Sequence, residues 1–374
     1  MEGKCDDSRK EFIMIVGCPR SGTYLLTTML QANFRIGIPV ETHFIPLFYP
    51  VKGLFGDLTK DKNRGRFLKC IYDFLAIWTP RSERGRDPSV IKEHSLLSTL
   101  DRVDEVLQNV QTYGGLVLSL FNTYGKKHAS TVVGDKSAFY RHVPLEVFDR
   151  IIPRLKVIHI IRDGRDVSLS WTKLWFGPST LAEATKEWRN HIVGKKSWGE
   201  QHPDRYLEIR YEDLLDDPDA AVHEAGNFLD LPYDPYAKQS ASELSQALAA
   251  GEVHPLLSKP IMKTNKEKWR EIMSPSELQL FDFIAGDVLA ECGYETFSQQ
   301  VSMSTKIRLM GKIWISCLRD AFSRRNLQLK IKTVLPWLIW ICAVARIPLV
   351  KLLNSKNYSN YLLPAIHGGT KQEK

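Results

Sequence analysis

The chain has 374 residues, of which 43% are hydrophobic and 25% are charged. This composition is that of an ordinary globular protein, and it excludes wholesale disorder and fibrous architectures. The formal net charge of +8 is unevenly placed, because residues 306–374 hold 13 of the 51 Lys and Arg but 2 of the 43 Asp and Glu. This segment therefore carries +11 and the first 305 residues carry −3, so we do not expect a nucleic-acid-binding surface across the body of the protein.

A strand, a loop and a helix are expected near the N-terminus. The apolar run 12–17 ends in glycine and is typical of a strand that is buried on both faces of a parallel sheet. A loop over residues 18–23 follows, and apolar residues then recur at helical spacing over residues 24–34. This order of elements opens many α/β nucleotide-binding folds.

A second unit of the same kind lies in the middle of the chain. Apolar and β-branched residues over 156–161 indicate a strand, residues 162–166 turn the chain, and a helical pattern resumes over residues 167–175. Further strands are expected at 131–134 and 206–209, and further helices at 88–112, 140–150, 179–198, 210–229, 236–250 and 275–291. Because strands alternate with helices, we predict an α/β fold in which helices flank a parallel β-sheet.

Composition divides the chain into an N-terminal arm over residues 1–11, one domain over residues 12–300 and a basic, amphipathic helical tail over residues 301–374. The uncharged run 333–345 in this tail is too short to span a bilayer, which requires about 20 apolar residues. Trp and aliphatic residues mixed with Lys and Arg over 306–356 are instead typical of a helix that lies on an anionic membrane surface. The alternative is that the same apolar stripe packs against the domain.

The six cysteines lie far apart and form neither a CxxC pair nor a pattern with histidine. This spacing predicts free thiols in a reducing compartment, rather than a disulfide framework or a zinc site. The N-terminal residues are charged where a signal peptide needs an apolar stretch. We therefore expect a cytoplasmic protein, held at the inner face of a membrane if the tail binds lipid.

The loop after the first expected strand has the spacing of a phosphate-binding loop. Gly17 and Gly22 form a GxxxxG pattern, whose backbone N–H groups and following helix N-terminus suit a phosphate. An ATPase loop continues with Lys and a hydroxyl residue, but here Thr23 and Tyr24 follow, and the cation lies inside the loop at Arg20. This arrangement suits one cradled phosphate beside a second anionic group better than a Mg²⁺-bound triphosphate.

A second phosphate clamp is expected after the strand at 156–161. Arg162 ends this strand and Ser170 lies eight residues on, two turns into the helix, so that both can converge on one phosphate. The neighbouring Asp163, Arg165 and Asp166 are expected to form ion pairs that support the fold. Two such clamps in one chain indicate a ligand with two separated phosphates.

These two motifs resemble those of the PAPS-dependent sulfotransferase superfamily, where PAPS is 3′-phosphoadenosine 5′-phosphosulfate. Residues 19–23 (PRSGT) resemble its 5′-phosphosulfate loop, and residues 161–170 (IRDGRDVSLS) resemble its 3′-phosphate motif. The similarity extends over residues 12–295 and includes the segments 134–136, 211–214 and 258–270. It implies a P-loop-like α/β fold, PAPS as co-substrate and no catalytic metal.

The resemblance also implies roles on the donor side of the site. Arg20 would stabilise the bridging oxygen and the leaving phosphate. Tyr24 departs from the Thr that is usual in the family, so only its backbone contact carries over directly. The residues implied to bind PAPS are Arg20, Ser21, Gly22, Thr23, Tyr24, Arg162, Ser170, Tyr211, Ser258, Lys268 and Trp269.

Glu41 is the first choice for the catalytic base. The chain is more similar to bacterial and protein-tyrosine sulfotransferases than to the cytosolic steroid and phenol type, and in protein-tyrosine sulfotransferases a Glu in a similar Glu-Thr context is the base. We expect a partly dry pocket to raise the pKa of this carboxyl toward neutrality, which suits proton removal. His43 is the alternative base, and a third possibility is that both residues only cap the following helix or pack against it. Lys136 resembles a family lysine that faces the transferring group, the alternative being a salt bridge with Asp135 or another acid.

The sequence therefore predicts an enzyme that transfers a sulfonate from PAPS to a hydroxyl or amine of a small-molecule or lipid acceptor. Two other functions compete with it. A P-loop kinase would need ATP and Mg²⁺, and residues 22–24 argue against this. A non-catalytic, membrane-associated module would have no need of the set Arg20, Glu41, Lys136, Arg162 and Ser170.

Overall fold

The computed structural model describes residues 11–82, 87–137, 140, 143–174, 177–234, 261–297, 309–311, 313 and 315. The expected helix at 236–250, the expected donor-binding residue Ser258 and nearly all of the basic tail lie outside these residues.

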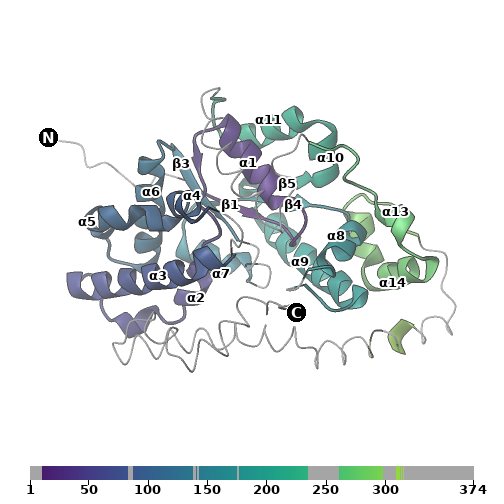
Figure 1. The fold of residues 1–374 in the computed structure, drawn as a ribbon, viewed down its shortest axis with the longest axis horizontal. Helices are drawn as coiled ribbons and strands as arrows, with labels where there is room; N and C mark the ends of the chain where they lie inside the picture. The colour runs from purple at the N-terminus through teal and green to yellow at the C-terminus, as the bar shows by residue number, and fades with distance from the viewer. Residues whose placement is uncertain are drawn as a thin grey trace, which may run out of the picture.

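Within the described residues, five strands form one parallel sheet in the order β2-β3-β1-β4-β5 (Figure 1). The strands are β1 (Phe12–Val16), β2 (Ile36–Gly37), β3 (Val132–Lys136), β4 (Leu155–Ile161) and β5 (Tyr206–Arg210). In the register of the central strand, Ile13 lies opposite Gly134 of β3 and Lys156 of β4. The predicted α/β fold with a parallel sheet is confirmed, and the carboxyl ends of β1, β3 and β4 meet at one edge of the sheet, where ligands bind in folds of this class.

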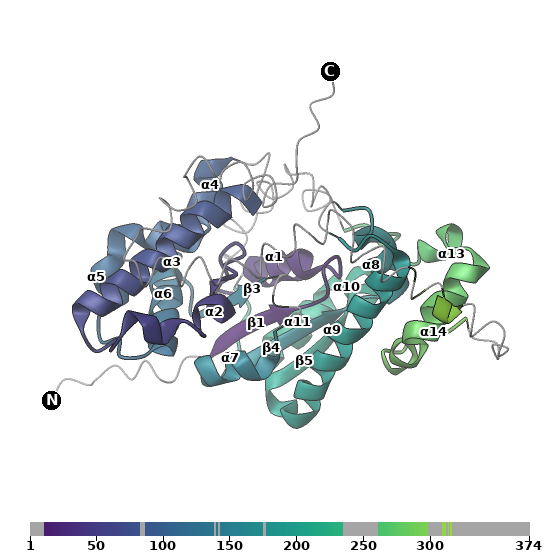
Figure 2. The same ribbon diagram turned by 90° about the horizontal axis from the view of Figure 1, so that it is seen from below.

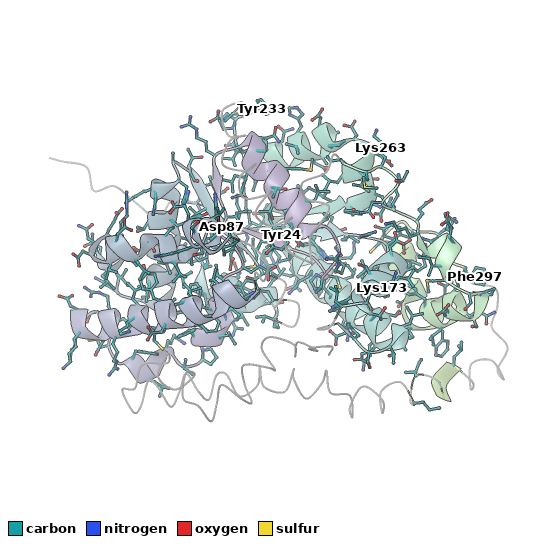
Figure 3. All side chains as sticks on the ribbon, viewed as in Figure 1. Tyr24, Asp87, Lys173, Tyr233, Lys263 and Phe297 are labelled. Atoms are coloured by element: carbon teal, nitrogen blue, oxygen red, sulfur yellow. The ribbon has the colours of Figure 1, made fainter. Side chains whose placement is uncertain are left out.

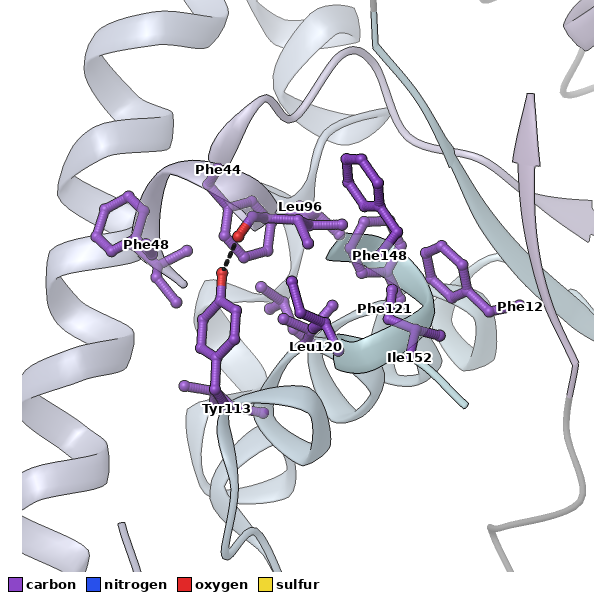
Figure 4. Packing of buried hydrophobic residues seen from close by; sticks show 14 of the residues in the cluster. Phe12, Phe44, Phe48, Leu96, Tyr113, Leu120, Phe121, Phe148 and Ile152 are labelled. Carbon is purple, nitrogen blue, oxygen red and sulfur yellow. Dashed lines mark hydrogen bonds between the residues drawn. The ribbon is translucent and has the colours of Figure 1, made fainter. Parts of the chain in front are cut away.

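Strand β1 is buried along its whole length, because its side chains alternate between two hydrophobic clusters. Phe12 and Met14 pack with α2 (Phe44–Phe48), α3 (Asp61–Ser82), α6 (Tyr113–Lys127) and α7 (Leu145–Ile151) on one face. Figure 4 shows part of this cluster, in which the Tyr113 hydroxyl donates to the carbonyl of Ile45 at 2.7 Å. Ile13 and Ile15 pack on the other face with α1 (Thr23–Asn33), α10 (Tyr211–Asp216) and α11 (Pro218–Phe228).

A third hydrophobic cluster joins α8 (Gly164–Trp171), α9 (Leu181–Gln201), α13 (Trp269–Ile272) and α14 (Pro275–Glu291) beyond the end of β4. These helices lie at the opposite end of the molecule from α3 and α6 (Figures 1 and 2). The sheet and the functional loops lie between the two helical groups. The remaining short elements are η2 (Lys52–Phe55), α4 (Pro88–Glu93), η3 (Leu96–Arg102), α5 (Val103–Leu107) and η5 (Pro203–Arg205).

Two expected helices differ from those observed. The stretch 88–112 contains three short helices instead of one, because the Ser95 hydroxyl accepts from the backbone N–H of Leu97 and starts a new element there. The stretch 210–229 is likewise divided where Asp217 caps α11. Strand β2 was not predicted, since two residues are too few to show a period.

Cys18, Cys70 and Cys292 are buried free thiols, as predicted for these three. The described part of the chain contains no helix that is both long and apolar enough to cross a membrane.

Candidate functional site

The loop between β1 and α1 turns tightly around two glycines. A Cβ on Gly17 would lie 2.7 Å from the Thr23 side chain, and one on Gly22 would lie 2.5 Å from the ring of Tyr211. Gly22 also has a φ of +94°, which favours glycine. The loop therefore packs closely against β4 and Tyr211 with its amides before helix α1, as a phosphate-binding loop requires.

The two predicted phosphate clamps are brought together. Arg20 Nε donates to the Ser170 hydroxyl at 3.0 Å, and Arg162 Nη1 donates to the carbonyl of Arg20 at 3.2 Å. Arg20 is held at a φ of +78°, a left-handed conformation that is strained for a residue with a side chain. Burial, with the nearby charge of Arg162, lowers the pKa of Arg20 from its ordinary value. Two cationic side chains from separate loops are thus concentrated at one place.

Arg162 is held from three sides. Its Nη2 donates to Asp166 at 3.2 Å and to the carbonyl of Asn265 at 3.0 Å, and its guanidinium lies 4.4 Å from the ring centre of Tyr211. Asn265 also donates to the Tyr211 hydroxyl at 2.8 Å. Asn265 was missed by the sequence analysis, because an isolated Asn about 100 residues from Arg162 carries no local signal.

Two buried polar atoms in these clamps have no hydrogen-bond partner among the described residues: Nε of Arg162 and Oγ of Ser21. Buried donors in proteins are almost always paired, so an unpaired group requires an explanation. A guanidinium N–H and a hydroxyl fit a phosphate, which accepts hydrogen bonds through several oxygens.

The predicted ion pairs around this clamp are present. Arg165 forms a salt bridge with Asp163 at 2.7 Å, and its guanidinium lies 3.5 Å from the ring centre of Trp269. The Trp269 backbone N–H donates to Asp166 at 2.9 Å. Trp269 is buried in the cluster of α8, α9 and α14, so it supports the Arg162 partner Asp166. Lys268 is exposed, and no contact of its side chain with the clamp is observed in the described part of the chain.

Glu41, His43 and Lys136 form a second group at the carboxyl end of β3. Lys136 Nζ donates to one Glu41 oxygen at 2.7 Å, and His43 Nε2 lies 3.1 Å from the other. The side chains of Lys136 and Glu41 are 2% and 12% exposed. Lys136 therefore pairs with Glu41 instead of Asp135, and both candidate bases belong to one cluster. His43 caps α2 with a φ of +59°.

The expectation of a raised pKa for Glu41 is wrong for this structure. Burial alone would raise it, but the charge of Lys136 and the hydrogen bonds from His43 and Lys136 outweigh burial and hold the pKa well below its usual range. Glu41 is therefore ionised at neutral pH and is a weak base while Lys136 is bonded to it.

Tyr24 links the two groups. It lies in the first turn of α1, directly after the phosphate-binding loop, near the centre of the molecule (Figure 3). Lys136 Nζ lies 2.9 Å from the centre of its ring. The aromatic side chain at this position thus contacts the lysine of the second group, an interaction that the usual Thr would not provide.

The described residues contain no group of His, Cys, Asp and Glu that could hold a metal ion. What the arrangement offers instead is a set of cations and hydroxyls suited to anions, next to a buried carboxylate that can accept a proton.

The sequence of the chain is similar to known proteins of one family. A family model described as the Sulfotransferase family matches residues 12–235. Protein-tyrosine sulfotransferase 1 of Danio rerio is 22% identical over 293 residues, which cover 76% of this chain and 72% of that protein.

Two solved structures match this chain, and the first of them is similar in fold. The sulfotransferase domain from the Synechococcus PCC 7002 olefin synthase is 23% identical with a TM-score of 0.50, covering 78% of this chain and 98% of that one. The sulfotransferase domain from the curacin biosynthetic pathway is 20% identical with a TM-score of 0.48, covering 77% of this chain and 99% of that one. Since the family model spans more than half of the chain, the protein belongs to the sulfotransferase family, as its motifs predicted.

Proposed function

We propose that the protein transfers a sulfonate group from PAPS to a hydroxyl or amine of an acceptor. The observation that carries the proposal is the union of two strand-end clamps, in which Arg20 donates to Ser170 and Arg162 donates to the carbonyl of Arg20. Arg162 and Ser170 would hold the 3′-phosphate, and the residues of the loop at 20–24 would hold the 5′-phosphosulfate. The unpaired buried donors in the clamp support an anionic ligand.

In the proposed reaction, the acceptor oxygen forms a bond to sulfur while the bond between sulfur and the 5′-phosphate oxygen breaks. The electron pair of the broken bond leaves on that phosphate oxygen, where Arg20 stabilises the charge. Lys136 stabilises the sulfonate oxygens. The acceptor proton passes to Glu41. The alternative base is His43, whose Nε2 lies 3.1 Å from the same carboxylate.

The pairing of Glu41 with Lys136 suggests how the base gains strength when the donor binds. Lys136 lowers the pKa of Glu41 through charge and a 2.7 Å hydrogen bond. A sulfonate next to the ammonium competes for it and adds negative charge, and both effects raise the pKa of Glu41. The carboxylate is therefore a stronger base in the presence of the donor than in its absence.

Calorimetric titration with PAP, the desulfated product, against ATP and Mg²⁺ tests this function. We expect PAP to bind and ATP with Mg²⁺ to bind much more weakly. Arg162→Ala should weaken PAP binding by on the order of 100-fold, since a buried charge-assisted contact is lost. Arg189→Ala, which removes a half-exposed ion pair with Asp287, is the matched control and should leave binding unchanged. A preference for ATP with Mg²⁺ would indicate a kinase instead.

The proposed acceptor is a small molecule or a lipid presented at a membrane, because the basic tail suits an anionic surface. The site residues alone do not distinguish among acceptor classes, since the same fold serves many functions. In the full-length chain, replacing Arg324, Arg325, Lys330 and Lys332 with Gln should reduce binding to phosphatidylserine vesicles by roughly 100-fold or more. Unchanged vesicle binding would argue against membrane association through the tail. The proposal that the protein transfers a sulfonate would still stand.

A further inference from the structure

The segment 41–43 crosses the carboxyl end of β3 and contacts the last two residues of that strand on opposite sides. Consecutive residues of a strand point to opposite faces of the sheet, so Asp135 and Lys136 diverge. Glu41 pairs with Lys136, and the next residue, Thr42, bonds to Asp135. The segment is therefore held by hydrogen bonds to both of these residues.

The contact on the Asp135 side is a buried hydrogen-bond network. The Thr42 and Tyr140 hydroxyls donate to the same Asp135 oxygen at 2.7 and 2.6 Å, and the other oxygen accepts from the Lys136 N–H at 2.9 Å. Ser137 Oγ accepts from the N–H groups of Thr42 and His43 at 3.2 and 3.3 Å. Asp135 is 0% exposed and Thr42 is 1% exposed.

This network acts where the backbone is strained. His43 has a φ of +59°, and such conformations persist only when the surrounding contacts impose them. The hydrogen bonds of Thr42 and His43 to Asp135 and Ser137 supply those contacts. Without them, the segment could relax, and Glu41 would move away from Lys136 and His43.

We infer that Asp135 is a positioning residue, which acts through Thr42 to hold the Glu41 carboxylate between Lys136 and His43. The inference rests on the proposed role of Glu41 as base. Asp135 has no exposed surface and therefore does not meet substrate itself. Its carboxylate fixes the direction in which the neighbouring segment presents Glu41.

Kinetic measurements on Thr42 and Asp135 variants test the inference. Thr42→Val keeps the shape but removes the hydroxyl, and Asp135→Asn removes the charge. In both, kcat should fall by roughly 10- to 100-fold, the size of effect expected from a displaced catalytic group, while the KM for PAPS changes by less than about threefold. Thr42→Ser restores the hydroxyl and should restore kcat to within about threefold. Thr185→Val is the matched control, because it also removes a buried hydroxyl, one that donates to the Leu181 carbonyl in α9, and should leave kcat unchanged.

A second readout does not depend on activity. The titration of the Glu41 carboxyl, followed by ¹³C NMR in the donor-free protein, should move upward by at least about one pH unit in Thr42→Val, because the carboxylate loses Lys136 and His43. If folded Thr42→Val keeps both the wild-type kcat and the wild-type titration of Glu41, the inference is overturned. If the wild-type protein transfers no sulfonate but the titration still moves, the proposed function fails and the positioning role of Asp135 stands.

Discussion

The donor clamp (Arg20, Arg162 and Ser170) and the Glu41 cluster (Glu41, His43 and Lys136) lie at the same edge of the sheet. They differ in how far their charged and polar groups are already paired. In the clamp, Nε of Arg162 and Oγ of Ser21 are buried and have no partner among the described residues. In the Glu41 cluster, both oxygens of the buried carboxylate are engaged by Lys136 and His43. The clamp therefore has polar atoms left for an incoming anion, whereas the negative charge of Glu41, the proposed base, is already paired with its surroundings.

This difference indicates an order of events in the proposed reaction. The clamp keeps buried polar atoms of Arg162 and Ser21 unpaired among the described residues, and an anionic donor can pair with them. The Glu41 carboxylate becomes a useful base only when part of its stabilisation is taken over by another anion. We therefore expect donor binding to precede and promote proton transfer. Tyr24, which directly follows the loop of the clamp, contacts Lys136 of the Glu41 cluster.

The largest expected effect concerns Glu41. Glu41→Gln keeps an oxygen that can accept from Lys136 but removes the base, so kcat should fall by roughly 10²- to 10⁴-fold while PAP binding is retained. His43→Asn should reduce kcat much less if histidine only orients Glu41. Steady-state kinetics on both variants decides between them, and a larger loss in His43→Asn would assign the base to histidine.

Arg20 should have the next largest effect and belongs to the clamp alone. Arg20→Ala removes the cation that stabilises the leaving phosphate, and kcat should fall by roughly 10²- to 10³-fold, as when one donor to a developing charge is removed. Arg20→Lys should recover part of this loss. Because the Glu41 cluster is untouched, the ¹³C titration of Glu41 in the donor-free protein should not move. A shift in that titration would mean that the two groups are coupled even without donor.

Tyr24 tests the contact between the clamp and the Glu41 cluster. Tyr24→Leu removes the ring face that contacts the Lys136 ammonium, an interaction of up to about 2 kcal/mol at a buried site, so kcat should fall on the order of tenfold. Tyr24→Phe keeps the ring and should behave like the wild type. If Tyr24→Phe loses as much activity as Tyr24→Leu, the hydroxyl is the important group and the ring contact is not.

The clamp was predictable from the sequence, whereas the contacts of the Glu41 cluster were not. Arg162 and Ser170 lie on one strand–loop–helix unit, so their spacing alone places them together. Thr42 and Asp135 are ordinary residue types 93 positions apart, and only the parallel sheet brings them into contact. The shift in the pKa of Glu41 was predicted in the wrong direction for the same reason. The direction of this shift depends on Lys136, and only the three-dimensional structure shows that Lys136 pairs with Glu41.

The smallest expected effect concerns the pH dependence of stability at Asp135. Burial, against the hydrogen bonds of Tyr140 and Thr42, raises the pKa of Asp135 to about 6. The folded state therefore binds a proton more readily than the unfolded state, in which the pKa is about 3.9, and this carboxyl stabilises the fold more as pH falls below 7. The free energy of unfolding of the wild type relative to Asp135→Asn should rise by about 1 kcal/mol between pH 7 and pH 5. Urea denaturation of both proteins at the two pH values measures this difference. If this difference in the free energy of unfolding falls instead, Asp135 is held ionised by its partners, as Glu41 is. The two carboxyls would then not differ in the direction of their pKa shifts.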